Sequence, residues 1–364
     1  MNRVQPKLFE PITLRGHTVR NRIWIPPMCQ YSAFAQDGVA TDWHLAHLGS
    51  FARGGAGAVI AEATSVTAEG RISPEDLGLW SDEQEEALKR IVSFVHSQGA
   101  SAGIQLAHAG RKASTFGPFA EESGSVPRGQ GGWQTLGSTE EPFQGLEAPQ
   151  ALDSAGISRI VAAFAASAER ALRAGFDLIE IHAAHGYLLH EFLSPLSNTR
   201  NDAYGGSLAG RARLLLEVVD AVRTQVGPQV PVLVRVSATD WVEEGLTLDD
   251  TVELAQWLKD HGVDLIDVSS GGNVPVRFPV GPGYQVPLAA AIGTQTGMPV
   301  AAVGLITDPV QAEHILFTGQ ADVVLIGREA LRDPHFGLRA AQHFGHSLPY
   351  VPTQYSRGFG AGKK

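Results

Sequence analysis

The segment 181–187, Ile-His-Ala-Ala-His-Gly-Tyr, carries three side chains that can do acid–base chemistry. His182 and His185 follow an apolar run, and a helical turn there would point both imidazoles the same way. Neutral imidazoles can donate hydrogen bonds to a carbonyl oxygen as negative charge builds on it. Tyr187 follows directly, and a phenol with an ordinary pKa of about 10 stays protonated at neutral pH. The segment predicts a site that stabilises an anionic oxygen and supplies a proton.

Two other interpretations apply to these histidines. Each could be a buried structural side chain whose hydrogen bonds are satisfied. Together with Glu191 they could also bind a metal ion, because zinc takes histidine and carboxylate ligands. A catalytic zinc needs three well-placed ligands, whereas the other polar groups expected nearby are amides and guanidinium groups. We therefore favour a site without metal.

Glycines and arginines predict a second site. Gly304 and the pair Gly327-Arg328 each follow a short apolar run, where backbone N–H groups and the start of a helix can hold a phosphate. Arg328 would add a charge-assisted contact. The alternative is that Gly327-Arg328 is only a helix start with a surface arginine. Gln105 and Arg235 offer donors and acceptors that suit the carbonyl and imide edge of a flat heterocycle.

The elements that would position these residues follow a repeating pattern. Short runs rich in β-branched residues alternate with longer amphipathic stretches, which is typical of parallel strands joined by helices. The eight strand-like runs are Ile23 to Cys29, Ala58 to Ser65, Ala102 to Leu106, Asp177 to His182, Pro231 to Val236, Val263 to Ser269, Pro299 to Val303 and Asp322 to Ile326. The helical stretches include Asp82 to Ser97, Ile157 to Ala174, Ala209 to Val226, Leu248 to His261 and Pro309 to Thr318. The pattern predicts an α/β fold, a single (β/α)₈ TIM barrel domain over 1–364.

Local signals support the repeat. The segments 174–177, 261–264 and 318–322 each place a glycine where a helix would end, just before a predicted strand. Residues 113–152 are rich in Gly, Pro, Ser and Glu and show no helical periodicity. We interpret them as an insertion after the third strand at the top of the barrel, with a small hairpin around Trp133.

Composition excludes several classes of protein. The 28 Lys plus Arg stand against 38 Asp plus Glu, and this net charge of −10 argues against a nucleic-acid partner. Apolar runs of about eighteen uncharged residues are missing, so we expect no membrane span. The single cysteine, Cys29, cannot form an internal disulfide or a cysteine metal cluster, which fits a reducing cytoplasm.

The predicted strand ends also exclude the main rival chemistries of barrels. Lysine ends none of the runs, so a Schiff-base aldolase would lack its nucleophile. An acid is missing after the seventh run, so a glycosidase would lack one carboxylate. The sequence has no His-x-His pair at a strand end, and too few carboxylates there for a two-metal hydrolase.

Six segments of the chain resemble those of a known family. The segments that carry the resemblance are Pro26 to Tyr31, Gln105 to Ala113, His182 to Leu188, Ser194 to Asn198, Asp202 to Ser207 and Gly327-Arg328. In this order they resemble the Old Yellow Enzyme family of flavin-dependent ene-reductases, over Lys7 to about Phe359. Cys29 and the tail 354–359 resemble the thermophilic-like bacterial subclass, which includes xenobiotic reductases.

The resemblance implies an NADPH dehydrogenase type of oxidoreductase that holds FMN non-covalently. NADPH or NADH would reduce the FMN, and the C=C bond of an α,β-unsaturated carbonyl or nitro compound would then be reduced. The implied flavin contacts are Pro26, Pro27, Met28, Cys29, Ala63, Gln105, Arg235, Gly304, Gly327 and Arg328. Tyr187 would donate the proton, while His182 and His185 would hold the substrate oxygen. Tyr31 would help to bind the substrate, and Cys29 would tune the flavin.

The tail implies an oligomer with shared sites. Arg357 matches an arginine that in this subclass reaches the neighbouring subunit's site, and the tail 354–364 lies beyond the last barrel helix. Tyrosine and arginine are enriched where interfaces concentrate binding energy, and two-fold symmetry is common. We therefore expect a homodimer or homotetramer, with the last residues, 360–364, disordered.

Two regions are longer here than in the compact members of the family. The segment 116–150 is longer than in those members and 280–284 adds residues, so substrate preference is the property they affect.

Two other functions are alternatives to this one. A dihydroorotate or dihydrouridine oxidoreductase would use a cysteine or serine base on a loop, whereas Cys29 ends the first predicted strand. A barrel that no longer catalyses a reaction and only binds a ligand would be expected to have lost one of His182, His185, Tyr187 or Arg328. All four are present.

Overall fold

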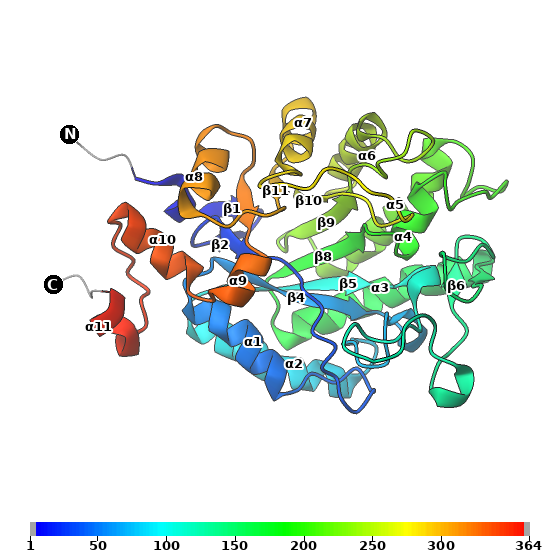
Figure 1. Ribbon diagram of the computed structural model, residues 1–364, viewed down its shortest axis with the longest axis horizontal. Helices are drawn as coiled ribbons and strands as arrows, with labels where there is room; N and C mark the ends of the chain where they lie inside the picture. Colours follow the sequence, from blue (N-terminus) through cyan, green and yellow to red (C-terminus); the bar gives the residue numbers. More distant parts are fainter. Residues whose placement is uncertain (1–4, 360–364) are drawn as a thin grey trace.

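Eight parallel strands close into a barrel at the centre of the molecule, and helices surround it (Figure 1). The computed structural model describes residues 5–359. The barrel strands are β3 (Ile23–Ile25), β4 (Ala58–Ser65), β5 (Ser101–Ala107), β8 (Leu178–Ala183), β9 (Val232–Ser237), β10 (Leu265–Ser269), β11 (Val300–Ala302) and β12 (Val323–Leu325). They pair in this order, and β12 pairs with β3 to close the ring. Every residue of these eight strands is buried, as expected for strands covered on both faces. The predicted (β/α)₈ barrel is confirmed.

Helices form the outer layer. They are α1 (Asp42–Arg53), α2 (Asp82–Ser97), α3 (Ser154–Ala174), α4 (Leu188–Leu193), α5 (Leu208–Val226), α6 (Leu248–Asp260), α7 (Val286–Thr296), α8 (Pro309–Phe317), α9 (Arg328–Arg332), α10 (Phe336–Phe344) and α11 (Ser356–Phe359). Their boundaries have local causes. Helix α2 begins with a capping box between Ser81 and Gln84. The glycines predicted at helix ends, Gly175, Gly262 and Gly319, all have positive φ (97°, 84° and 71°).

A hairpin near the N-terminus covers the end of the barrel where the strands begin. It is formed by β1 (Ile12–Leu14) and β2 (His17–Val19), which pair antiparallel. Ile12, Leu14 and Val19 belong to one buried apolar cluster with the first residues of several barrel strands, including Ala58, Leu178, Leu265 and Val323. The chemistry is therefore confined to the opposite end, where the strands finish.

The insertion 113–152 has little regular structure, as predicted, but the hairpin predicted around Trp133 is wrong. The insertion contains a 3₁₀ turn, η4 (Arg128–Gln130), and two short strands, β6 (Leu136–Gly137) and β7 (Gln150–Ala151), which pair parallel. The Trp133 indole donates to the carbonyl oxygen of Glu69 (2.7 Å), and the Trp133 backbone N–H donates to Ser114 Oγ (3.0 Å). These contacts with distant segments replace the ladder that a local hairpin would make.

The tail folds back on the chain. A 3₁₀ turn, η5 (Thr353–Tyr355), leads into α11, and the rings of Tyr355 and Phe359 lie 5.3 Å and 6.1 Å from the ring of His335. Arg357 is exposed. The prediction of disorder over 360–364 falls outside the described residues. Within residues 5–359, none of the helices is both long enough and apolar enough to cross a membrane.

Candidate active site

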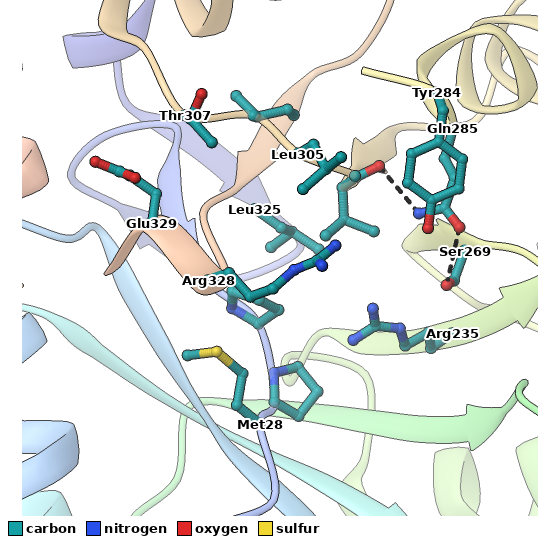
Figure 2. A pocket seen from close by; sticks show the side chains of 16 residues that line it. Met28, Arg235, Ser269, Tyr284, Gln285, Leu305, Thr307, Leu325, Arg328 and Glu329 are labelled. Carbon is teal, nitrogen blue, oxygen red and sulfur yellow. Dashed lines mark hydrogen bonds between the residues drawn. The ribbon is translucent and has the colours of Figure 1, made fainter. Parts of the chain in front are cut away.

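A cavity of about 220 Å³ opens at the ends of the strands (Figure 2). Its walls come from the segment after β3, from β9 and β10, and from the loops that follow β11 and β12. Seven of the residues predicted to bind a cofactor line it: Pro26, Pro27, Met28, Arg235, Gly304, Gly327 and Arg328. Segments far apart in the sequence are thus brought together as predicted.

The cavity suits an anion. The guanidinium groups of Arg328 and Arg235 both extend into it (Figure 2). No carboxylate within residues 5–359 forms an ion pair with Arg328, whereas Arg235 Nε lies 3.4 Å from Asp267 Oδ2. Gly304 lines the cavity with a φ of 128°, and an added Cβ there would lie 3.0 Å from the Tyr284 ring. A cavity lined by two guanidinium groups and by glycine backbone suits a phosphate.

Below this cavity the barrel holds a layer of buried polar groups. Gln105 on β5 donates through Nε2 to Glu180 Oε1 on β8 (2.8 Å), while Arg235 on β9 faces Asp267 on β10. Glu180 Oε2, Arg235 Nε and both Asp267 oxygens make no hydrogen bond to the described residues. Burial raises the pKa of Glu180 to about 8 and that of Asp267 to about 6, although Arg235 lowers both. Gln105 is therefore fixed by an acid that the sequence analysis did not single out.

His182, His185 and Tyr187 form one cluster at the end of β8. The His182 ring meets the rings of His185 and Tyr187 edge to face, with centroids 5.2 Å and 5.0 Å apart. His182 is paired with Arg235 in the β8–β9 register, and His185 contacts Ser269, which also lines the cavity. The cluster and the cavity are thus parts of one site.

Both histidines are neutral. Burial lowers the pKa of His182 and of His185 well below the ordinary value, and the nearby charge of Arg235 adds to the effect. The Ala184 N–H donates to His182 Nδ1 (3.2 Å), so the hydrogen of His182 stands on Nε2. His185 Nε2 pairs with Ser269 Oγ (2.7 Å), which leaves Nδ1 as its second polar atom. Each imidazole keeps one ring nitrogen for another partner.

Tyr187 is protonated. Burial raises the pKa of its phenol well above 10, and Cys29, Tyr31 and Asp76 add to this rise. The ring is partly exposed and borders a very small cavity that Ala63 also lines. Within residues 5–359 its hydroxyl forms no hydrogen bond, so it is available to donate to another molecule.

Cys29 and Tyr31 lie in the loop after β3. Burial raises the pKa of the Cys29 thiol, and the neighbouring Gln30 N–H donates to the buried carboxyl of Glu62 (3.0 Å). Tyr31 has a φ of 53° and lines a second pocket, of about 300 Å³, together with residues of the insertion such as Phe116 and Phe119. The insertion therefore lines the same pocket as Tyr31, the residue predicted to help bind the substrate.

Two further candidates lie apart from the cluster. The Glu191 carboxylate accepts from the backbone N–H groups of Arg111 (2.7 Å) and Ser138 (3.2 Å), so it is engaged away from the two histidines. Arg357, on α11, does not line any of the cavities described above. Within the described part of the chain, we find no group of three or more His, Cys, Asp or Glu side chains able to hold a metal ion.

Several polar residues of the site were missed by the sequence analysis. Glu180 and Asp267 stand inside apolar strands, two residues before His182 and Ser269. An acid within a buried strand was the signal that could have revealed them. Gln285, which donates to the Val303 carbonyl (3.1 Å) at the cavity wall, gave no local signal.

The sequence is similar to that of known flavin oxidoreductases. Residues 7–346 match the family described as NADH:flavin oxidoreductase / NADH oxidase. The chain is 49% identical over 354 residues to the NADPH dehydrogenase of Listeria innocua, covering 97% of this chain and 99% of that protein. It is 45% identical over 356 residues to the NADPH dehydrogenase of Halalkalibacterium halodurans, covering 98% and 100%.

Solved structures of Old Yellow Enzyme-like proteins have the same fold. Morphinone reductase superimposes with a TM-score of 0.77 at 27% identity, covering 96% of this chain and 92% of that one. The old yellow enzyme homologue from Zymomonas mobilis also has a TM-score of 0.77 at 27% identity, covering 97% and 98%. With the family match spanning the barrel, the chain belongs to the NADH:flavin oxidoreductase / NADH oxidase family and is an Old Yellow Enzyme-like oxidoreductase that uses FMN, with NADPH or NADH as electron donor.

Proposed function

We propose that this enzyme is an ene-reductase, which reduces the activated C=C bond of α,β-unsaturated carbonyl or nitro compounds. The observation that carries the proposal is the cluster of His182, His185 and Tyr187. Two neutral imidazoles and a protonated phenol beside a flavin cavity supply what such a reaction needs, a stabilised oxygen and a proton. The FMN, when bound, supplies the hydride that it has received from the nicotinamide.

The residues present fit FMN. Arg328 would pair with its phosphate, because this guanidinium extends into the cavity without a carboxylate partner within the described residues. Arg235 and Gln105 would contact the ring system. The remaining proposed contacts are Pro26, Pro27, Met28, Cys29, Ala63, Gly304 and Gly327.

The substrate would be held through its oxygen. His182 Nε2–H would donate to a carbonyl or nitro oxygen. His185 would donate from Nδ1 when Ser269 gives its hydroxyl hydrogen to His185 Nε2 (2.7 Å) in place of Gln285 Oε1 (3.3 Å). Both donors are most effective as the oxygen becomes negative, which stabilises the transition state more than the substrate. Tyr187 would then protonate the carbon next to the carbonyl group. Tyr31 would line the substrate pocket.

A phenol tests the histidine pair before any turnover. Phenolates mimic the anionic oxygen, and their long-wavelength absorption over an oxidised flavin reports binding. His182→Ala and His185→Ala should each weaken phenol binding about tenfold to hundredfold, since a hydrogen bond to a charged group is worth about 1.5–3 kcal/mol. FMN content should not change. His343→Ala, which alters an exposed histidine on α10, is the matched control. Unchanged phenol affinity in both site variants would contradict the proposal.

A further inference from the structure

The turn that carries the cluster is strained. His185 and Gly186 both have a left-handed backbone, with φ of 61° and 73°. This conformation costs a residue with a side chain about 1–2 kcal/mol. Gly186 is also packed closely, because an added Cβ would lie 2.4 Å from the carbonyl oxygen of Gly272. Such a turn persists only when its surroundings hold it.

Three side chains hold this turn, of which Ser237 and His190 are fully buried and Lys112 is half-buried. The His185 N–H donates to Ser237 Oγ (2.9 Å). The peptide that joins His185 to Gly186 is held at both of its polar atoms: Lys112 Nζ donates to its oxygen (2.8 Å), and its N–H donates to His190 Nδ1 (2.9 Å). His190 lies on α4, one turn beyond Gly186, so it fixes the segment between His185 and Tyr187.

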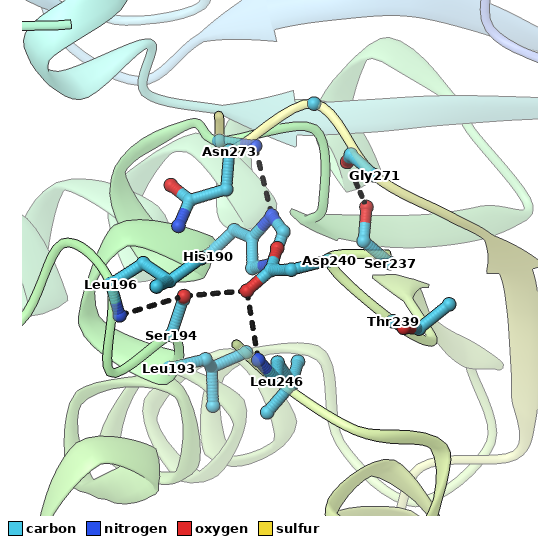
Figure 3. Close-up of polar contacts among 12 residues, drawn as sticks. His190, Leu193, Ser194, Leu196, Ser237, Thr239, Asp240, Leu246, Gly271 and Asn273 are labelled. Carbon is cyan, nitrogen blue, oxygen red and sulfur yellow. Dashed lines mark hydrogen bonds and ion pairs between the residues drawn. The ribbon is translucent and has the colours of Figure 1, made fainter. Parts of the chain in front are cut away.

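Asp240 faces the other ring nitrogen of His190. Because Nδ1 accepts from Gly186, the hydrogen of neutral His190 stands on Nε2, which lies 3.2 Å from Asp240 Oδ1 (Figure 3). The other oxygen, Oδ2, accepts from the Ser194 hydroxyl (2.6 Å) and the Leu246 N–H (2.9 Å). Both His190 and Asp240 are fully buried. Burial alone would raise the pKa of Asp240, but these contacts outweigh it and hold the pKa below the usual value.

We infer that His190 and Asp240 are positioning residues for the reaction, in which Asp240 fixes the tautomer of His190 that holds the Gly186 N–H and so aims His185 and Tyr187 at the substrate. Neither residue touches the cluster's free ring nitrogens or the Tyr187 hydroxyl. The inference rests on the function proposed above. A carboxylate that orients an imidazole by selecting its tautomer is a known device in enzymes.

Asp240→Asn tests the inference with almost no change in volume. The two donors at Oδ2, from Ser194 and Leu246, require an oxygen at that position, so the new NH₂ group would take the place of Oδ1. It would donate to His190 Nε2 and drive the hydrogen to Nδ1. Nδ1 could then no longer accept from Gly186, and two donors would face each other.

We expect Asp240→Asn to weaken phenol binding at least tenfold while FMN content stays stoichiometric. The rate of enone reduction should fall with it, whereas FMN reduction by the nicotinamide should not. His190→Phe, which keeps a ring but removes the acceptor, should act in the same direction. Nitrogen-15 spectra of the histidine rings should show the hydrogen of His190 on Nε2 in the wild type and on Nδ1 in Asp240→Asn.

The matched control is Thr251→Val on α6. It removes a buried hydroxyl that bonds the carbonyl oxygens of Ala238 and Thr247 (3.1 Å each) outside the His190 contacts. It should lower the melting temperature and leave phenol binding unchanged. The inference is wrong if Asp240→Asn binds phenol like the wild type while His182→Ala does not. If His182→Ala and His185→Ala also bind phenol normally, the proposed function fails first and the inference falls with it.

Discussion

The side chains of the site are set up as donors that carry no positive charge. Burial keeps His182 and His185 neutral and keeps the Tyr187 phenol protonated, so all three can donate hydrogen bonds or protons across the neutral pH range. The positive charge near them comes from Arg235 and Lys112. This arrangement stabilises an oxygen that gains negative charge during the reaction.

Tyr187→Phe tests the proton donor. The change removes one oxygen and little volume, so enone reduction should slow by about 10² to 10⁴, the span of general-acid catalysis. The nicotinamide half-reaction does not need this proton and should proceed at the wild-type rate. Stopped-flow absorbance can follow the two half-reactions separately. Equal losses in both would indicate a structural role for the phenol.

At this scale the sequence predicted the residues that share a short segment and missed those that depend on tertiary contacts. His182, His185 and Tyr187 are neighbours in the chain and therefore visible together. Asp240 lies fifty residues beyond His190, and only the packing of α4 against the loop after β9 joins them. Residue type alone did not mark either of them as part of the site.

Among the elements, the middle of the barrel stands out because it buries charge. Glu180, Arg235 and Asp267 lie on three adjacent strands, so two acids share one guanidinium. Burying a carboxylate is costly unless it is fully paired, and the structure favours the protonated form of Glu180. This layer gives stability a dependence on pH that an apolar barrel would lack.

Glu180→Gln should reveal that dependence. The folded pKa of about 8 exceeds the unfolded value of about 4.3. Between these values the folded state binds more protons, so the free energy of unfolding falls as pH rises from about 4.5 to 8. The variant lacks this loss, so its stability relative to wild type should increase from pH 5 to pH 8. Urea unfolding at both pH values measures it, with exposed Glu140→Gln as the control. A difference that does not vary with pH would contradict the assignment.

The elements themselves were largely predictable. All eight barrel strands lie where apolar runs predicted them, because a buried strand needs a continuous apolar stretch. The first strand, β3, ends at Ile25 rather than Cys29, since Pro26 and Pro27 lack the N–H groups that pairing needs. The hairpin of β1 and β2 escaped prediction because its strands are only three residues long.

The prediction that two subunits share each substrate site rests on the C-terminal tail. The rings of Tyr355 and Phe359 contact His335 of the same chain, so part of the apolar surface expected at an interface is used internally. Arg357 stays exposed between them. We still predict a homodimer or homotetramer in which Arg357 reaches the neighbouring substrate site.

Arg357→Ala tests that arrangement. Light scattering of the wild type should show more than one chain per particle. The variant should raise the KM for an enone about tenfold, which corresponds to ~1.4 kcal/mol of binding, and should keep its FMN. Arg90→Ala, at an exposed arginine on α2, should leave the KM unchanged. A fully active monomer would contradict the shared site and leave the barrel chemistry as proposed.

The hairpin of β1 and β2 also constrains the order of events. Because it covers the end of the barrel where the strands begin, we expect the electron donor and the electron acceptor to enter from the same end, where the strands finish. We expect the two compounds to occupy the site in turn, the first leaving before the second binds. An excess of either compound should then inhibit binding of the other. The turnover rate should therefore depend on the ratio of the two concentrations as well as on their absolute values.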